Sequence, residues 1–105
     1  MNIMTTTGEK LALLMTSIGI NFQTILRSDD SKLLPPIASF LHYEEFDFPG
    51  KLNLARMSAE MATDCAKLAL LTALIEDRNS QIFAMVASLF DQAANLIMDD
   101  LGIPA

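Results

Sequence analysis

The sequence predicts a single all-α domain built like a four-helix bundle. Apolar residues recur at three- and four-residue spacing along most of the 105 residues, which is typical of one face of a helix. The two-residue alternation typical of strands is absent, and valine occurs only once. Turn-forming residues divide the chain into four amphipathic segments with short connections. We therefore expect residues 1–105 to form one helical domain.

The first predicted helix runs from about Thr7 to Arg27. Thr6 and Glu9 have the spacing of a capping box, in which each side chain satisfies a free backbone donor at the start of a helix. The apolar residues that follow share one helix face. They are Leu11, Leu14, Met15, Ile18, Phe22, Ile25 and Leu26.

The second predicted helix follows a polar break at residues 28–31. Pro36 can occupy the first turn of a helix, where its missing N–H would have had no partner. Ile37, Phe40 and Leu41 give this helix a short apolar face. We expect it to end near Phe46, before a turn at Pro49–Gly50.

The third predicted helix runs from about Lys51 or Asn53 to Asp77. Its first half has one polar stripe, at Asn53, Arg56, Glu60, Thr63 and Lys67. The same stripe continues into Leu70, Leu71 and Leu74, and nearly all of residues 68–75 is apolar. A helix that is apolar all round must be covered all round.

The fourth predicted helix begins after Asn79 or Ser80 and ends near Leu101, where Gly102 stands as a helix-ending glycine. It carries two neighbouring apolar ridges, which are more than one packing contact requires. One ridge is Ile82, Val86, Leu89, Ala93 and Leu96, and the other is Phe83, Phe90, Ile97 and Leu101.

These apolar surfaces predict a homodimer. Hydrophobic residues make up 51% of the chain and charged residues only 19%, which is more apolar surface than one small core can hide. Two copies could cover it with one self-complementary interface. The predicted interface residues are Leu70, Leu71, Leu74, Phe83, Phe90 and Ile97. The alternative is that the first two helices cover the third within one chain, and under either alternative we expect Leu71→Glu and Leu74→Glu to unfold the protein.

The charge and cysteine content limit the partners and the compartment. The net charge is −6 and the seven basic residues are scattered, which argues against nucleic-acid and anionic-membrane binding. No stretch approaches the length of apolar sequence that spans a bilayer. The single cysteine, Cys65, stands among apolar residues and is expected to be buried. We expect a cytoplasmic protein.

Two carboxylates are the strongest candidates for chemistry. Glu60 and Asp64 lie four residues apart, so they could share a divalent cation in a metal-dependent hydrolase. The favoured interpretation is a solvated face on which Arg56 and Lys67 supply counter-charges. His42 is the only histidine, so one chain cannot build a multi-histidine metal site. We expect no cofactor.

An acidic-aromatic segment precedes the predicted turn. Its aromatics and acids could form a patch for a basic protein partner. The candidate patch is Tyr43, Glu44, Glu45, Asp47 and Phe48. The alternative, which we favour, is that the aromatic side chains fold inward while the acidic side chains stay in water.

The function that the sequence favours is that of a small non-catalytic interaction or regulatory protein acting as a homodimer. Recognisable catalytic motifs are missing from the sequence. A helical pocket for a small apolar ligand is the main alternative. It would need a cavity on the order of a few hundred Å³ with one or two polar groups at its mouth.

Overall fold

The computed structural model describes residues 6–23 and 37–103. Its elements are α1 (Thr7–Gln23), α2 (Ile37–Leu41), the 3-10 turn η2 (Tyr43–Glu45), α3 (Phe48–Leu74) and α4 (Ser80–Asp100). The described part is 85% helical and contains no strand, which confirms the all-α prediction. The predicted continuation of the first helix through Ile25 and Leu26 to Arg27, the predicted break at residues 28–31 and the predicted place of Pro36 in the second helix lie outside the described residues.

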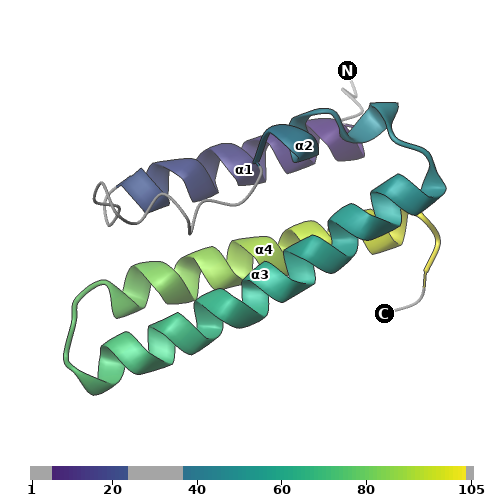
Figure 1. Cartoon of the computed structure of the whole chain (residues 1–105). Helices are drawn as coiled ribbons and strands as arrows, with labels where there is room; N and C mark the ends of the chain where they lie inside the picture. The colour runs from purple at the N-terminus through teal and green to yellow at the C-terminus, as the bar shows by residue number, and fades with distance from the viewer. Residues whose placement is uncertain (1–5, 24–36, 104–105) are drawn as a thin grey trace.

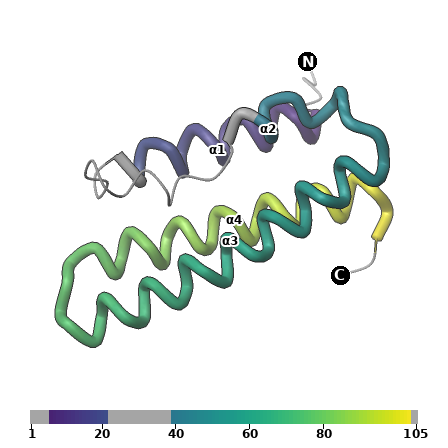
Figure 2. The backbone as a smooth tube through the Cα atoms, in the orientation of Figure 1, coloured from purple at the N-terminus to yellow at the C-terminus, as the bar shows by residue number. Residues whose placement is uncertain are grey.

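Three long helices form the body of the molecule. Figure 1 shows α3 and α4 as an antiparallel hairpin, with α1 running antiparallel to α4 on its other side and α2 beside α1. The second predicted helix is therefore much shorter than expected: it breaks at His42, and only the single 3-10 turn η2 follows. The tube in Figure 2 places the start of α3 and the end of α4 at one end of the molecule, and the α3–α4 turn at the other.

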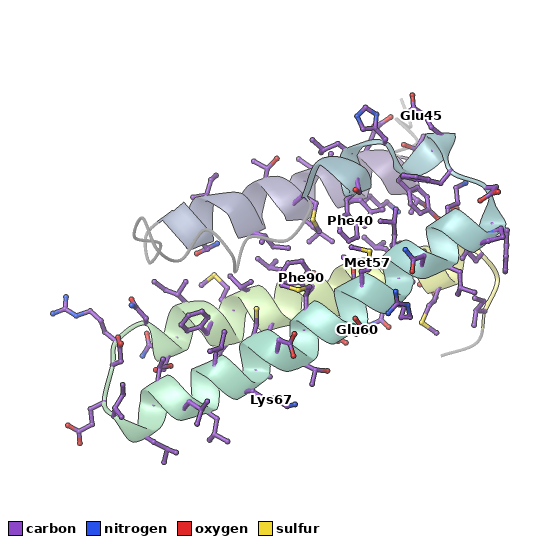
Figure 3. The ribbon with its side chains drawn as sticks, in the orientation of Figure 1. Phe40, Glu45, Met57, Glu60, Lys67 and Phe90 are labelled. Carbon is purple, nitrogen blue, oxygen red and sulfur yellow. The ribbon has the colours of Figure 1, made fainter. Side chains whose placement is uncertain are left out.

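The core lies where α1, α2 and η2 meet the α3–α4 hairpin. Figure 3 shows Phe40, Met57 and Phe90 between these two layers. Phe40 and Phe90 are fully buried. All three long helices contribute apolar residues at three- and four-residue spacing, as the sequence predicts. The buried apolar residues are Leu11, Met15, Ile18, Phe40, Tyr43, Leu54, Ala55, Cys65, Phe83, Val86, Phe90, Ala93, Ala94 and Ile97.

The start of α1 and the end of α4 have the geometry that the sequence predicts. The Glu9 amide donates to Thr6 Oγ1 at 3.1 Å, which is one half of the predicted capping box. At the other end, Gly102 has a φ of 73°, in the left-handed region that glycine adopts without strain. The Gly102 and Ile103 amides donate to the carbonyls of Asp99 and Met98, which closes α4 with a Schellman motif.

The predicted turn at Pro49–Gly50 is wrong, because these residues form the first turn of α3. The Asp47 side chain is the N-cap and accepts from the Gly50 amide at 2.9 Å. A proline in the first helical turn loses no intrahelical hydrogen bond, so Pro49 fits there. The helix therefore begins at Phe48, earlier than predicted, and ends at Leu74 rather than Asp77.

Both ridges of α4 contribute to the core, whereas the sequence predicts that the second ridge faces another copy. Phe83, Phe90 and Ile97, predicted to face a second copy, are buried in the chain's own core. In the other ridge, Val86 and Ala93 are fully buried, while Leu89 and Leu96 are half-buried. The reason is the position of α4 between α3 and α1, since both neighbours pack on α4.

Candidate interaction surface

The end of α3 carries four large aliphatic side chains that the described chain leaves exposed. Leu70 is 65% exposed, Leu71 58%, Leu74 73% and Ile75 73%. We call these four residues the α3 apolar patch. Leu70, Leu71 and Leu74 continue the exposed polar stripe of the helix, as the sequence predicts. The alternative in which the first two helices cover this segment completely is wrong for the described residues.

The patch lies on the side of α3 opposite the core. The inward side of the helix carries Leu54, Ser58 and Cys65, all buried. Figure 3 shows Lys67, which shares the outer stripe with Leu71, on the side of α3 away from α1 and α2. Because the patch faces outward, glutamate at position 71 would remain in water and should not unfold the chain, which corrects the expectation from the sequence.

Charges border the patch in balanced numbers. Lys67 precedes it on α3, and Glu76, Asp77 and Arg78 follow it in the turn to α4. Two positive and two negative residues therefore surround the patch, whereas the whole chain carries a net charge of −6. Among the described residues, the border of the patch is therefore neutral.

The predicted six-residue dimer interface is thus divided by the structure. Leu70, Leu71 and Leu74 are exposed, while Phe83, Phe90 and Ile97 belong to the core. Ile75, 73% exposed, is not among those six residues, although it ends the apolar run at residues 68–75 on which the dimer prediction is based.

The acidic-aromatic segment is an internal brace. Tyr43 is fully buried, and its hydroxyl donates to Asp100 Oδ2 at 2.6 Å. Lys51 Nζ lies 4.8 Å from the centre of the Tyr43 ring, within the range of a cation–π contact. Glu44 Oε1 accepts from the Gly8 amide at 2.9 Å, so it caps a helix 36 positions earlier in the chain. The segment ties α1, α3 and α4 together at one end.

The rest of this segment is divided between local contacts and solvent. Glu45 Oε2 lies 2.8 Å from His42 Nδ1, and Asp47 caps α3. Phe46 and Phe48 are exposed, so the inward interpretation holds for Tyr43 alone. Tyr43 is buried and therefore not part of an exposed partner patch, whereas Glu44, Glu45, Asp47 and Phe48 stay exposed.

The hydrogen bond between Tyr43 and Asp100 shifts the pKa of both side chains. Burial, together with that bond and the nearby carboxylate charges, raises the pKa of Tyr43 above its usual value. The same bond, with help from Thr7 and the charge of Lys51, holds the pKa of Asp100 below its usual value although partial burial opposes it. The hydrogen bond therefore favours a neutral Tyr43 phenol and an ionised Asp100 carboxylate.

The carboxylates of α3 belong to an exposed ion-paired face. Arg56 Nη1 donates to Glu60 Oε1 at 2.5 Å, and Arg56 Nη2 donates to Asn53 Oδ1 at 2.8 Å. Asp64 stands nearby on the same face. Within residues 6–23 and 37–103, no group of three or more His, Cys, Asp or Glu side chains could hold a metal ion. The pair Glu60 and Asp64 lacks a third ligand there.

An open apolar groove of about 530 Å³ runs between the first half of α3 and the end of α4. Only two of its lining side chains are strongly polar, Asn53 and Arg56, and both also make the hydrogen bonds just described. The groove is lined by Pro49, Leu52, Asn53, Ala55, Arg56, Ala59, Met98 and Ile103.

Comparisons with protein-family models, curated proteins and solved structures found no match for this chain. The α3 apolar patch and the α3/α4 groove are two surfaces that fold formation leaves unexplained. A second groove of about 530 Å³ lies between α1 and α4, and its lining includes Leu13, Leu14, Leu89 and Leu96.

Cys65 is part of the core and not of either surface. Its side chain is buried, as the sequence predicts, and burial together with the charge of Asp64 raises the pKa of Cys65 to about 11. A thiol with this pKa is almost entirely protonated at neutral pH, and the thiolate is the reactive form. Cys65 is therefore a small apolar core residue.

By length and composition alone, α4 is long and apolar enough to cross a membrane, which the sequence analysis did not anticipate. A core helix passes the same test. In this structure α4 places Phe83, Phe90 and Ile97 against the other helices. Asp91, near its middle, is exposed. One third of the apolar window of α4 is buried within the described structure.

Proposed function

We propose that this chain is a non-catalytic interaction protein that pairs with a second copy of itself through the α3 apolar patch. The observation that carries the proposal is the exposure of four adjacent aliphatic side chains at one end of the molecule. Complete burial of one such side chain contributes about 1.5–3 kcal/mol. Contiguous exposed apolar patches bordered by charges are typical of interaction sites.

The charge distribution favours a second copy as the occupant. Two chains that each carry a net charge of −6 repel one another over most of their surfaces. The border of the patch is neutral, with Lys67 and Arg78 balancing Glu76 and Asp77. A second copy can therefore approach there without net repulsion between the two borders. Four aliphatic side chains per copy are a small interface, so we expect a dissociation constant in the micromolar range.

Glutamate substitutions in the patch test this proposal. In Leu71→Glu and Leu74→Glu, each dimer would enclose two carboxylates in an apolar interface. We expect the dissociation constant to rise at least about 100-fold. Because both positions are exposed, the melting temperature of the monomer should change little. Sedimentation equilibrium at tens of micromolar gives the mass, and circular dichroism gives the melting temperature.

Leu13→Glu provides a matched control. Leu13 is 71% exposed, close to the 73% of Leu74, but it lies on α1 outside the patch. This variant should retain wild-type dimerisation. A wild-type protein that is monomeric at tens of micromolar would refute the proposal, as would equal loss of dimer in Leu13→Glu.

The α3/α4 groove supports a second candidate function, binding of a small apolar ligand. Its volume of about 530 Å³ and its two polar lining side chains, Asn53 and Arg56, support this candidate. We expect a medium-chain fatty acid, used as a probe, to bind by calorimetry. Ala59→Trp, which fills the groove, should abolish that binding, whereas Leu71→Glu should retain it. No heat of binding to the wild-type protein would exclude this function for the probe class.

A further inference from the structure

The charges along the outer side of α3 have an order that distinguishes the ways in which two copies can pair. Lys67 precedes Leu71 by four residues and Asp64 precedes it by seven, so all three share one face of the helix. Beyond the patch, Glu76, Asp77 and Arg78 follow in the turn to α4. Along the chain the order is therefore negative at Asp64, positive at Lys67, apolar through the patch, negative at Glu76 and Asp77, and positive at Arg78.

An antiparallel pair about a two-fold axis at Leu71 brings opposite charges together. In this arrangement Lys67 of one copy lies beside Ile75 and Glu76 of the other copy, where the patch of that copy ends. The same reversal carries Asp64 towards the partner's Arg78. A parallel pair would instead place each charged residue beside the same residue of the other copy, with Lys67 facing Lys67 and Glu76 facing Glu76. Like charges that face one another directly are destabilising.

The shape of the molecule favours the same arrangement. Its principal extents are 44 × 27 × 27 Å, and Figures 1 and 2 show the hairpin turn at one end of the long direction. Antiparallel pairing about Leu71 directs the two acidic bodies away from each other. Parallel pairing would align them along the whole of α3, and it would also align the two helix dipoles.

The backbone at Glu76 is a second observation. Its φ of 57° lies in the left-handed region, where glutamate is less favourable than glycine. Its amide donates to the Ala73 carbonyl at 3.0 Å, within the motif that closes α3. A charged side chain thus occupies a position where glycine would be less strained, directly beside the patch. Strained residues of this kind are more frequent at functional sites.

We infer that two copies of this chain pair antiparallel through the α3 apolar patch, with Leu71 at the two-fold axis and Lys67 of each copy beside Glu76 of the other. The inference rests on the proposed self-association and adds its geometry. It makes Lys67 and Glu76 determinants of the pairing orientation.

Disulfide cross-linking tests the orientation. We expect Leu71→Cys to form a covalent dimer under mild oxidation, because the two introduced thiols meet at the axis. Glu60→Cys should not, since eleven residues separate position 60 from the axis and the two copies of that position would lie about 33 Å apart. Cys65 can remain in both variants, because its buried thiol gives the wild-type protein no route to a cross-link.

Charge reversal tests the proposed pair. Lys67→Glu and Glu76→Lys should each weaken the dimer by up to roughly tenfold, because each change acts twice in a symmetric pair. The double variant exchanges the two charges and should recover most of the wild-type affinity. Arg56→Glu, on the same stripe but outside the overlap, is the control and should leave the dissociation constant unchanged. Sedimentation equilibrium at low salt measures each value.

The outcomes separate the orientation from the dimer itself. A wild-type dimer in which Glu60→Cys cross-links as fast as Leu71→Cys would show parallel pairing and overturn the inference while the proposed function stands. A wild-type dimer without cross-linking in Leu71→Cys, or without recovery in the double charge variant, would overturn it in the same way. A monomeric wild-type protein would overturn both.

Discussion

Phe90→Ala is expected to lower the free energy of unfolding by about 3–5 kcal/mol. Phe90 is fully buried at the centre of α4, where the hairpin meets α1 and α2. Truncation to alanine removes the ring's transfer free energy and leaves a cavity that well-packed neighbours fill only partly. Chemical denaturation followed by circular dichroism measures the difference. A domain of this size has limited total stability, so the variant should be close to its unfolding threshold at room temperature.

Leu71→Ala is the control for this prediction. It removes an aliphatic side chain from the outer side of α3, and it should cost less than about 1 kcal/mol when measured on the monomer at low protein concentration. The comparison is informative because the sequence placed Phe90 and Leu71 in one predicted interface. Equal losses of stability from both variants would contradict the separation into core and patch that the structure makes.

The sequence was a good guide to α3 because the relevant signal is local. The polar stripe through Lys67 and its continuation into Leu71 can be read from helical periodicity alone, and the structure confirms that both are exposed. On α4 the same reasoning failed. Its two ridges are equally apolar, and only the positions of α3 and α1 decide that Phe90 is enclosed while Leu89 stays half-buried. Tertiary placement of this kind is not encoded in the periodicity of one helix.

The ends of the elements show the same division between local and long-range information. The cap at Thr6 and the glycine at Gly102 act on their own helices, and both were predicted. Pro49–Gly50 was misread because a proline–glycine pair is typical of turns, and the cap from Asp47 determines the outcome instead. The bond from Tyr43 to Asp100 spans 57 positions, so no sequence spacing could reveal it.

The brace between Tyr43 and Asp100 leads to a second large effect, a stability that falls at both ends of the pH range. The pKa of Asp100 is lower in the folded protein than in the unfolded chain, where aspartate has a pKa of about 3.9. A lowered folded pKa contributes stability above the unfolded pKa, and that contribution is lost as the pH falls through the folded value. Acidification below about pH 4 should therefore destabilise the protein.

The decline of stability at high pH comes from the phenol of Tyr43 together with the buried thiol of Cys65, whose pKa is raised to about 11. The pKa of Tyr43 is raised in the folded protein, whereas a tyrosine in the unfolded chain has a pKa of about 10. At a pH between the unfolded and the folded pKa of Tyr43, the folded state holds a proton that the unfolded state has lost. The free energy of unfolding therefore decreases as the pH rises above about 10. Tyr43 is the only tyrosine and tryptophan is absent, so tyrosinate absorbance reports this one group. Ionisation should coincide with unfolding followed by circular dichroism.

Tyr43→Phe tests both limbs with one variant. It keeps the buried ring but removes the hydroxyl that donates to Asp100, so it should lower the free energy of unfolding at pH 7 by about 1–2 kcal/mol. The loss should shrink towards pH 3, because a protonated carboxyl gains less from the bond. The decline above pH 10 should become shallower and leave only the part that the buried thiol of Cys65 contributes. Asp99→Asn, a change at an exposed neighbour, is the control and should retain the wild-type profile. A Tyr43→Phe protein with the same acid and alkaline midpoints as the wild type would show that the brace does not set the pH dependence.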